Sequence, residues 1–379
     1  MMDVKTLDWR PETGWSKPVE SVVGLDSAST LVLVFAASDV GPEPFADLRS
    51  ALPLSLITGC STAGQIRGRQ LSSDPVLATV VRFEHSRPTL AWVELAGAKD
   101  STSAGRKLGL QLAGTGTTEP RHVLLLSVGL DVNGSDLVAG LTAELPAGTR
   151  VSGGLAGDEA DFDRTWVYCG DQLRERGVVA IDLGSAVDVS YGSEGGWEGF
   201  GPSRRITRSE GNMLLELDDR PALALYKEYL GMLVDDLPAS ALRFPLAIES
   251  SDGGTTYVRT VLAVDEDMNT MTFAGDVPVG WSARLMRTTT ERLVDGAAGA
   301  AAASAQPDGS LAIAISCVGR RLTLGEWTED EIEAVADALQ ATTGTIVGFY
   351  SYGEISPTLG VNGLHNQTMT VSVISEQSP

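Results

Sequence analysis

Three short segments of the chain place hydroxyl, thiol and carboxylate side chains between closely spaced glycines. They are Gly59–Gly64 (GCSTAG), Gly153–Asp158 (GGLAGD) and Gly348–Glu354 (GFYSYGE). An apolar run precedes each segment, so we expect each to be a turn at the end of a buried strand. In open α/β sheets, ligands bind outside the carboxyl ends of strands, and these turns are therefore the first candidates for a functional site. We expect the third turn to expose two tyrosines, a serine and a carboxylate.

The first segment offers two candidate nucleophiles, Cys60 and Ser61. It partly matches the G-x-S-x-G elbow of serine hydrolases, but a glycine-containing stretch follows it in place of a helix. A serine hydrolase also needs a positioned histidine base, and the few histidines of the chain favour solvated strand ends. Turn amides could lower the pKa of the Cys60 thiol, and the alternative is a small side chain buried under a tight turn. We expect binding, with a cysteine- or serine-dependent enzyme as the competing hypothesis.

Charged and aromatic groups in and near the third segment suit a small zwitterion such as an amino acid. Glu354 can accept from an ammonium group, and Arg320 can clamp a carboxylate. His365 and Asn366 can donate and accept hydrogen bonds beside a tyrosine wall. The alternatives are a structural ion pair for Arg320 and simple loop capping by Asn366. The predicted ligand contacts are Cys60, Ser61, Thr62, Gln65, Asp158, Arg320, Tyr350, Tyr352, Glu354, His365 and Asn366.

The strands and helices predicted around the three segments repeat as well. Each is preceded by an apolar strand and a helix and is followed by another strand, which indicates three diverged copies of one strand-helix-strand-turn-strand unit. The expected first strands are Leu31–Ala37, Val123–Val128 and Leu311–Cys317. The expected helices are Glu43–Leu52, Ser135–Leu145 and Glu329–Thr342. The expected closing strands are Pro75–Phe83, Thr165–Cys169 and Gln367–Ile374.

These units predict an α/β protein with mixed sheets and two packed domains. We expect an N-terminal extension at residues 1–29, a first domain at 30–215 and a second domain at 216–379. Gly177–Leu183 and Val187–Tyr191 are expected to extend the sheet of the second copy. The glycine-rich stretch Gly192–Pro202 predicts a mobile loop, as a lid or as the joint between domains. Beyond it, Thr256–Val264 is expected to be one strand of a meander.

The composition of the 379-residue chain excludes some classes of partner. It carries 28 basic and 50 acidic residues, a net charge of −22, which argues against nucleic acid or an anionic membrane as the main partner. The three cysteines are widely spaced, as expected for reduced thiols in the cytoplasm. The N-terminus has no secretory signal pattern, and no apolar run reaches the ~18 residues that span a bilayer. We therefore expect a cytoplasmic protein without membrane insertion.

Metal and nucleotide motifs are weak in the sequence. No two histidines lie near each other, and the acidic stretch Asp158–Asp163 lacks the frame of an EF-hand loop. We find neither a P-loop nor a glycine motif of the dinucleotide-binding type. The motifs therefore predict no metal and no cofactor.

Five motifs, taken together and in this order, resemble the signatures of FIST-domain proteins. The resemblance spans roughly residues 30 to 374 and implies an N-terminal and a C-terminal part. The motifs are Gly59–Gly64, Gly153–Asp158, Cys317–Arg320, Gly348–Ile355 and Leu364–Thr368.

The resemblance implies a non-catalytic sensory module, of a kind found in bacteria and eukaryotes, that binds amino acids or their derivatives. It also implies signalling to a histidine kinase or a cyclic-dinucleotide enzyme. Because the motifs leave little room for a fused output domain, we expect that partner to be a separate protein. Some relatives are proposed to bind haem and sense nitric oxide. In this chain the axial ligand would then be His365, Cys317 or a tyrosine, with Cys60 a further candidate.

Overall fold

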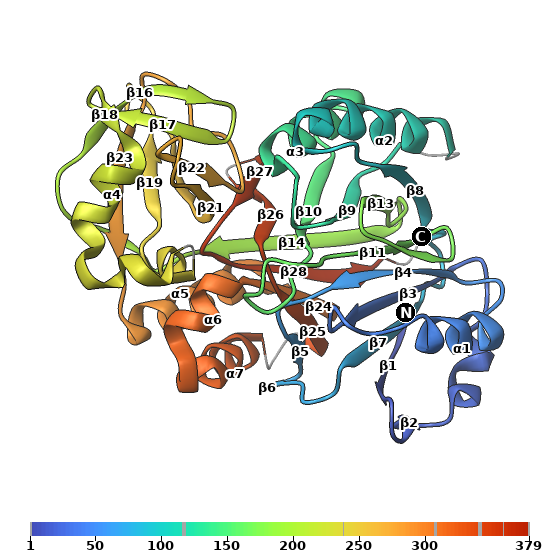
Figure 1. The fold of residues 1–379 in the computed structure, drawn as a ribbon. Coiled ribbons are helices and arrows are strands. Elements are labelled where there is room, and N and C mark those ends of the chain that lie inside the picture. Colours follow the sequence, from blue (N-terminus) through green and yellow to red (C-terminus); the bar gives the residue numbers. More distant parts are fainter. Residues whose placement is uncertain are drawn as a thin grey trace.

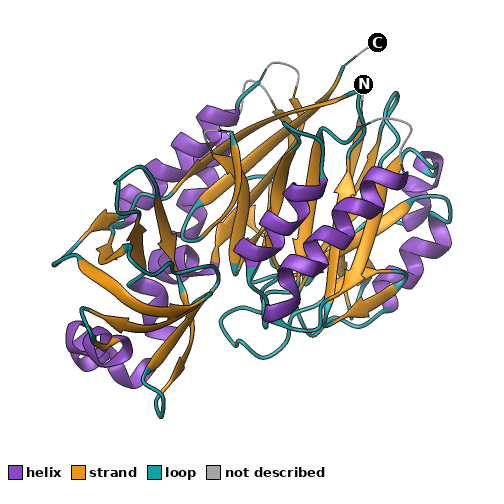
Figure 2. Cartoon of the chain, turned by 90° about the horizontal axis from the view of Figure 1, so that it is seen from above, coloured by secondary structure: helices purple, strands orange, loops and turns teal. Residues whose placement is uncertain are grey.

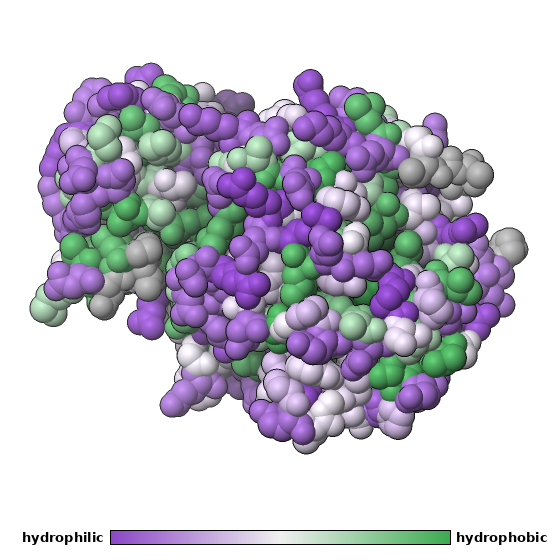
Figure 3. All heavy atoms as spheres, turned by 45° about the vertical axis from the view of Figure 1, so that its right-hand side comes forward, coloured by the Kyte–Doolittle hydropathy of each residue, from purple (hydrophilic) through white to green (hydrophobic). Residues whose placement is uncertain are grey.

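Three sheets with a common strand arrangement form the body of the molecule. A fourth sheet is inserted in the chain segment that builds the third (Figure 1). The computed structural model describes residues 2–115, 119–237, 239–306, 309–339, 343–358 and 360–377. Helices lie against the body sheets (Figure 2). Within the described ranges, no helix combines the length and the apolar character needed to cross a membrane. Hydrophilic residues cover most of the face drawn in Figure 3, as the charged composition predicts.

Each body sheet is built from an opening strand, two strands joined by a helix, and a closing strand. The first copy consists of β1 (Asp3–Arg10), η1 (Val19–Leu25), β3 (Thr30–Ala36), α1 (Glu43–Ala51), β4 (Leu56–Ser61) and β7 (Val76–Arg82). The second consists of β8 (Thr89–Glu94), α2 (Ser101–Thr115), β9 (His122–Ser127), α3 (Gly134–Glu144), β10 (Arg150–Leu155) and β13 (Gly177–Asp182). The third consists of β14 (Val187–Glu194), α5 (Thr290–Ser304), β24 (Gly309–Cys317), α7 (Thr328–Leu339), β25 (Thr343–Ser351) and β28 (Met369–Glu376).

The four strands of each copy take the same order in their sheet. These orders are β4-β3-β7-β1, β10-β9-β13-β8 and β25-β24-β28-β14. The two strands joined by a helix are parallel, and the closing strand is antiparallel to the first of them. A parallel pair needs a long crossover, which α1, α3 and α7 supply. The predicted triplication and the predicted α/β class with mixed sheets are confirmed, and the structure adds the opening strand.

A hairpin follows the second parallel strand of each copy and pairs with the sheet of a different copy. β5 (Gln65–Arg67) pairs with β25, β11 (Val167–Cys169) with β4, and β26 (Gly353–Thr358) with β10. The other halves of the hairpins are β6 (Gln70–Leu71), β12 (Gln172–Arg174) and β27 (Val361–His365). The first copy thus extends the third sheet, the second extends the first, and the third extends the second. This exchange links the three sheets in a closed cycle.

The three glycine segments meet where these hairpins cross over. Three backbone hydrogen bonds, from equivalent donors to equivalent acceptors, join them in a cycle that we call the central ring. These bonds are Gly157 N to Ser61 O (3.0 Å), Ala63 N to Tyr350 O (2.8 Å) and Tyr352 N to Leu155 O (3.1 Å).

Glycine is required at one position in the second strand of each parallel pair, because the backbone of the neighbouring strand comes very close there. A Cβ atom added to any of three equivalent glycines would lie under 2 Å from a carbonyl oxygen of the adjacent strand. These clashes are Gly59 with Val34 O (1.8 Å), Gly153 with Leu125 O (1.9 Å) and Gly348 with Ala314 O (1.7 Å). The clash is with backbone, so no rotamer change could relieve it.

The fourth sheet, which we call the inserted sheet, lies between β14 and α5 in the chain. It has a hydrophobic core of its own, which includes Ile206, Leu223 and Phe273, and forms a separate lobe in Figure 1. Its elements are β15 (Glu198–Gly199), β16 (Arg204–Glu210), β17 (Met213–Leu217), β18 (Arg220–Pro221), α4 (Ala222–Leu230), η3 (Gly231–Asp236), η4 (Ala239–Arg243), β19 (Leu246–Glu249), β20 (Thr256–Arg259), β21 (Val261–Asp265), β22 (Thr270–Phe273) and β23 (Ser282–Arg287). The remaining elements are β2 (Gly14–Trp15), η2 (Ala98–Asp100), α6 (Val318–Leu324) and η5 (Gly325–Trp327).

Three strand predictions are wrong because pairing partners cannot be read from local periodicity. Thr165–Cys169 is not the closing strand of the second copy but forms β11, in the first sheet. The closing strand is instead β13, within the predicted strand Gly177–Leu183. Val187–Tyr191 belongs to β14 and therefore to the third sheet. Thr256–Val264 is broken at Thr260 into β20 and β21.

The prediction of exposed turns is also wrong. Tyr350, Ser351, Tyr352 and Glu354 are each at most 1% exposed. The chain passes from β25 almost directly into β26, so these side chains lie in the interior where the copies meet.

The stretch Gly192–Pro202 is only partly a loop. β14 continues to Glu194, and β15 pairs with β23. The Trp197 indole donates to the Gln367 carbonyl oxygen (3.0 Å) and ties this stretch to the body. The last three residues of the predicted helix Glu329–Thr342 lie outside the described residues.

Alanine at the three equivalent glycines should destabilise the fold strongly. We expect Gly59→Ala, Gly153→Ala and Gly348→Ala each to lower the free energy of unfolding by about 3 kcal/mol or more, because the added Cβ meets backbone. Gly114→Ala is the matched control, since it lies in α2 with no atom within 4 Å of the added Cβ. It should be neutral or stabilise by up to about 1 kcal/mol. Urea denaturation followed by circular dichroism measures these changes, and wild-type stability of Gly348→Ala would contradict the expectation.

Candidate ligand cleft

Ten of the eleven predicted ligand contacts are buried, each at most 4% exposed. They gather around the central ring and the elements that pack on it, whereas His365 lies at the end of β27. None of the eleven lines any of the clefts described below. Their role as direct ligand contacts stays a prediction, and their surroundings show what else they do.

The two candidate nucleophiles lie in surroundings that do not activate them. Cys60 is fully buried, and burial raises the pKa of its thiol, the opposite of what a thiolate nucleophile needs. The Ser61 hydroxyl oxygen accepts a hydrogen bond from the Trp166 amide (3.1 Å). The Gln65 amide group is hydrogen-bonded to the Thr62 hydroxyl (2.9 Å). These bonds hold the first glycine segment to its neighbours.

Arg320 forms a buried structural ion pair. Its Nε lies 2.7 Å and its Nη2 2.6 Å from the Glu331 carboxylate, and both side chains are 0% exposed. The Tyr350 hydroxyl donates to the same carboxylate (2.8 Å), and burial raises the pKa of Tyr350 well above its ordinary value. Of the two alternatives that the sequence left open for Arg320, the structure contains the ion pair.

Hydrogen bonds from the protein occupy the Glu354 carboxyl. It accepts from the Ser351 hydroxyl (2.7 Å) and from the Thr368 amide (3.1 Å) and hydroxyl (3.0 Å). Burial nevertheless raises the pKa of Glu354 to about 8. At neutral pH the carboxyl is therefore mostly protonated, which suits an interior hydrogen-bonded group better than an acceptor for ammonium. The Asn366 side chain donates to the Tyr352 carbonyl oxygen (3.3 Å).

The histidine and the two cysteines considered for haem ligation are enclosed by other protein groups, and haem binding stays a prediction. His365 Nε2 lies 3.2 Å from the Ser356 carbonyl oxygen and 3.1 Å from the Thr358 hydroxyl, and burial lowers the pKa of His365 to about 4. Cys317 and Cys60 are fully buried and are not among the residues that line the clefts described here. Among the residues that the structure describes, no group of three or more His, Cys, Asp and Glu side chains could hold a metal ion.

Asp158 organises the loop that follows the second glycine segment. Its carboxylate accepts from the amides of Phe162 (3.2 Å), Asp163 (2.8 Å) and Arg164 (2.6 Å) and from the Tyr352 hydroxyl. These donors fix residues 159–164, which we call the Asp158 loop, against the central ring.

Strain and stacking mark Phe162 within the Asp158 loop. Phe162 has a φ of 53° and Glu159 a φ of 63°, and a bulky side chain rarely adopts this left-handed conformation. The Phe162 ring stacks on Tyr352, with 4.8 Å between ring centroids and 18° between planes. Surrounding contacts therefore hold Phe162 in place at a cost in backbone energy.

The cleft that we take as the candidate ligand site has a volume of about 690 Å³ and lies between the body and the inserted sheet. The body contributes η2, the segment after β9, the first turn of α3 and Phe162. The inserted sheet contributes residues of the β16–β17 turn, β21 and β22. Its lining residues are Ala98, Lys99, Leu130, Asp131, Val132, Asn133, Asp136, Phe162, Glu210, Gly211, Asn212, Met213, Leu262, Ala263, Thr272 and Phe273.

Charged groups stand beside an apolar wall in this cleft. The carboxylates are Asp131, Asp136 and Glu210, and the amine is Lys99. Burial, together with the charge of Asp276, raises the pKa of Asp136. In the part of the chain that the structure describes, neither Lys99 nor Glu210 forms an ion pair. A ligand with an ammonium group and a carboxylate would find a partner for each.

Asn133 fixes the geometry of this wall. Its side-chain oxygen accepts from the Ser135 (3.1 Å) and Asp136 (3.3 Å) amides and so caps α3. Its Nδ2 donates to the carboxylates of Asp136 (3.1 Å) and Asp276 (2.6 Å). One residue thus joins the body to the inserted sheet at the edge of the cleft.

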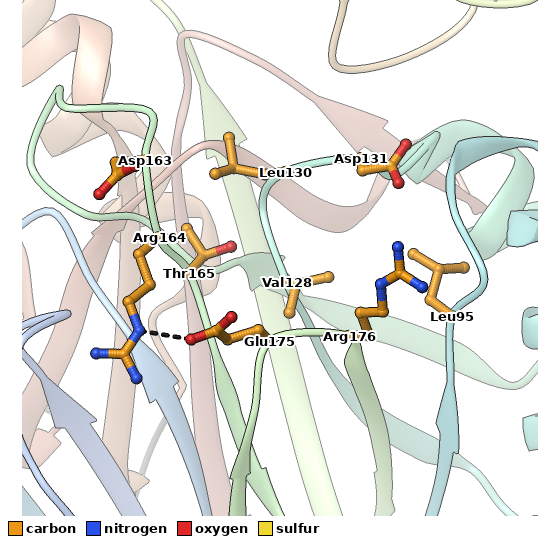
Figure 4. Close-up of a pocket in the computed structure, with 9 residues that line it drawn as sticks. All are labelled: Leu95, Val128, Leu130, Asp131, Asp163, Arg164, Thr165, Glu175 and Arg176. Carbon is orange, nitrogen blue, oxygen red and sulfur yellow. Dashed lines mark hydrogen bonds and ion pairs between the residues drawn. The ribbon is translucent and has the colours of Figure 1, made fainter.

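A smaller cleft of about 180 Å³ adjoins the first and shares Leu130 and Asp131 with it (Figure 4). Arg164 pairs there with Glu175 (2.7 Å). The Arg176 guanidinium lies beside Leu95 in Figure 4; Arg176 is exposed and forms no ion pair with the described residues. The Asp158 loop therefore reaches both clefts, through Phe162 in one and through Arg164 in the other.

The sequence analysis did not identify the residues that line the larger cleft, between the body and the inserted sheet. The strand-end rule that pointed to the glycine segments applies equally to Leu130–Asn133, which follow β9. An asparagine just before a predicted helix was a second usable signal. Nothing in the sequence could place Glu210 or Phe273 opposite them, because the inserted sheet reaches the cleft only through tertiary packing.

Removing the Arg320 guanidinium should unfold much of the protein at low urea. Arg320→Ala leaves the Glu331 carboxylate buried and unpaired, so we expect a loss of about 3–5 kcal/mol in the free energy of unfolding. Arg69→Ala, which breaks an exposed pair with Asp337, is the matched control and should change the free energy of unfolding little. Equal, small losses in urea denaturation would show that Arg320 has no structural role.

The Glu354 carboxyl should make stability fall as pH rises. Its folded-state pKa of about 8 exceeds the ordinary 4.5, so between these values the unfolded chain has lost a proton that the folded chain keeps. The free energy of unfolding should then decrease by up to about 1.4 kcal/mol per pH unit in this window. Urea denaturation of wild type and Glu354→Gln at several pH values measures the difference, and parallel pH profiles would contradict the prediction.

Comparison with known proteins places this fold in a family. The model for the FIST N domain matches residues 30–220, and the model for the FIST C domain matches residues 222–357. An uncharacterized protein of Mycobacterium tuberculosis is 24% identical over 357 residues, covering 89% of this chain and 88% of the relative. An uncharacterized protein of Methanocaldococcus jannaschii is 23% identical over 396 residues, covering 94% of this chain and 75% of the relative. Because the two matched regions span most of the sequence, the chain belongs to the FIST family.

Proposed function

We propose that this chain is a sensory protein that binds a small metabolite in the cleft between the body and the inserted sheet. FIST domains are small-ligand sensory domains of signalling proteins. The observation that carries the proposal is the cleft of about 690 Å³, because its walls come from two separate hydrophobic cores. A ligand held there touches both parts of the molecule at once.

The lining supports an amino acid or a related metabolite as the ligand. Asp136 and Glu210 suit an ammonium group, and Lys99 suits a carboxylate. Phe162, Met213 and other apolar side chains offer a wall for a hydrophobic side chain. This assignment moves the proposed recognition from Glu354 and Arg320, whose polar groups are already occupied, to groups that face the cleft.

The signal would be a change in how the inserted sheet packs on the body. A ligand shifts such an equilibrium only if it makes different contacts in the two arrangements. Contacts to Asp136 on one side and Glu210 on the other meet this condition. The chain enters the inserted sheet through the stretch around Gly195–Pro202, which would have to accommodate the shift.

The receiver of the signal would be a separate protein, such as a histidine kinase or a cyclic-dinucleotide enzyme. We also propose a cytoplasmic location, which the three free, buried cysteines support.

A thermal-shift screen of amino acids and related amines should find ligands that stabilise the full chain. At a ligand concentration of 100 times Kd the expected gain is about 2.7 kcal/mol, which raises Tm by a few degrees. Asp136→Asn and Glu210→Gln should each weaken binding about tenfold in calorimetric titration, since each removes a charge-assisted hydrogen bond. Asp330→Asn, an exposed change on α7, is the control and should bind like wild type. Ligands that bind all four proteins equally would place the site elsewhere.

A further inference from the structure

A second large groove lies where residues of all three copies meet, and its described lining residues all belong to the body. Its volume is about 590 Å³, and it is formed by α6, η5 and the start of α7 on one side and by the Asp158 loop on the other. The residues that line it are Leu71, Glu159, Ala160, Asp161, Val318, Arg321, Leu322, Gly325, Glu326, Thr328 and Glu329.

The groove joins an apolar floor to an acidic rim. Leu71, Val318 and Leu322 form the apolar part, and Trp327, between two lining residues, is 58% exposed. The rim carries the four carboxylates Glu159, Asp161, Glu326 and Glu329. Acidic residues in the first turn stabilise a helix, but of these four only Glu329 lies in the first turn of α7.

The one basic group among the described lining residues is already engaged. The Arg321 guanidinium pairs with Glu159 and donates to the Ala63 carbonyl oxygen. Within the described ranges, Asp161, Glu326 and Glu329 form no ion pair. These three carboxylates therefore present uncompensated negative charge around a hydrophobic floor.

We propose that this groove is the docking surface for the signalling partner, and that it receives a segment with lysine or arginine side chains beside an apolar anchor. The acidic rim favours basic residues in the partner segment through charge complementarity. The apolar floor of Leu71, Val318 and Leu322, with the exposed Trp327 next to it in sequence, favours the apolar anchor. The inference rests on the proposed sensory function, for which this groove is the output.

The position of the groove explains why it would respond to ligand. The Asp158 loop lines the ligand cleft with Phe162 and this groove with Glu159, Ala160 and Asp161. Through Arg321, the groove also contacts Ala63, a member of the central ring. A ligand that moves Phe162 therefore acts on a segment whose other end forms the docking surface.

The experiment uses the full chain and a short fluorescein-labelled peptide of alternating lysine and leucine, followed by fluorescence anisotropy at physiological salt. Glu326→Lys/Glu329→Lys should weaken peptide binding about tenfold or more, because rim attraction becomes repulsion. Glu249→Lys/Asp267→Lys makes the same change of charge on the inserted sheet and should weaken binding less than about twofold. Trp327→Ala, which leaves the charge unchanged, should also weaken binding.

Each alternative result overturns the inference. Equal losses in the two double variants would show that the peptide responds only to net charge, and absence of peptide binding would show that the groove is no docking surface. Thermal melts of the variants check that they fold, and the metabolite screen is repeated on each. Ligand-dependent shifts that persist without peptide binding would leave the proposed sensory function standing while this inference fails.

Discussion

The close approach of parallel strands at three equivalent positions is the constraint on which the rest of the structure depends. Gly59, Gly153 and Gly348 let each strand lie against the carbonyl of its neighbour, so the residues that follow can reach another copy. The central ring then joins the three copies through backbone hydrogen bonds alone. Side chains around the ring, such as Tyr350 and Tyr352, fill the space between sheets and add buried hydrogen bonds. The motifs that identify the family are therefore largely the parts that hold its copies together.

The sequence revealed the three repeated copies, but it did not distinguish polar residues with a structural role from polar residues of a binding site. Strand and helix positions followed from apolar periodicity, and the glycine spacing revealed three copies. The same pattern suggested an exposed polar site. A glycine turn with serine, tyrosine and glutamate has the same sequence pattern whether it faces solvent or packs against another sheet. Burial was decided by the hairpin exchange, which depends on pairing between residues as distant as Gly153 and Ile355.

The candidate cleft could not be predicted from local sequence patterns, for a related physical reason. Asp136 and Asn133 lie in a predictable place, at the start of a helix after a strand. Their partners Glu210 and Asp276 come from the inserted sheet, whose position on the body is fixed by contacts such as Asn133 to Asp276. Phe162 gives no sequence signal at all, yet its strained backbone and its stack on Tyr352 make it the contact between cleft and ring. Strain of this kind persists only where surrounding contacts fix it.

The exchange of hairpins has a consequence for how such a protein could arise. A chain with a single copy would carry its hairpin outward and leave the matching edge of its own sheet open. A cyclic homotrimer, in which every subunit lends its hairpin to the next, would pair that edge in all three sheets. Fusing three such genes would turn that symmetric assembly into one chain and free each copy to diverge, and an insertion into the third copy would then create a cleft at one face of the symmetric body.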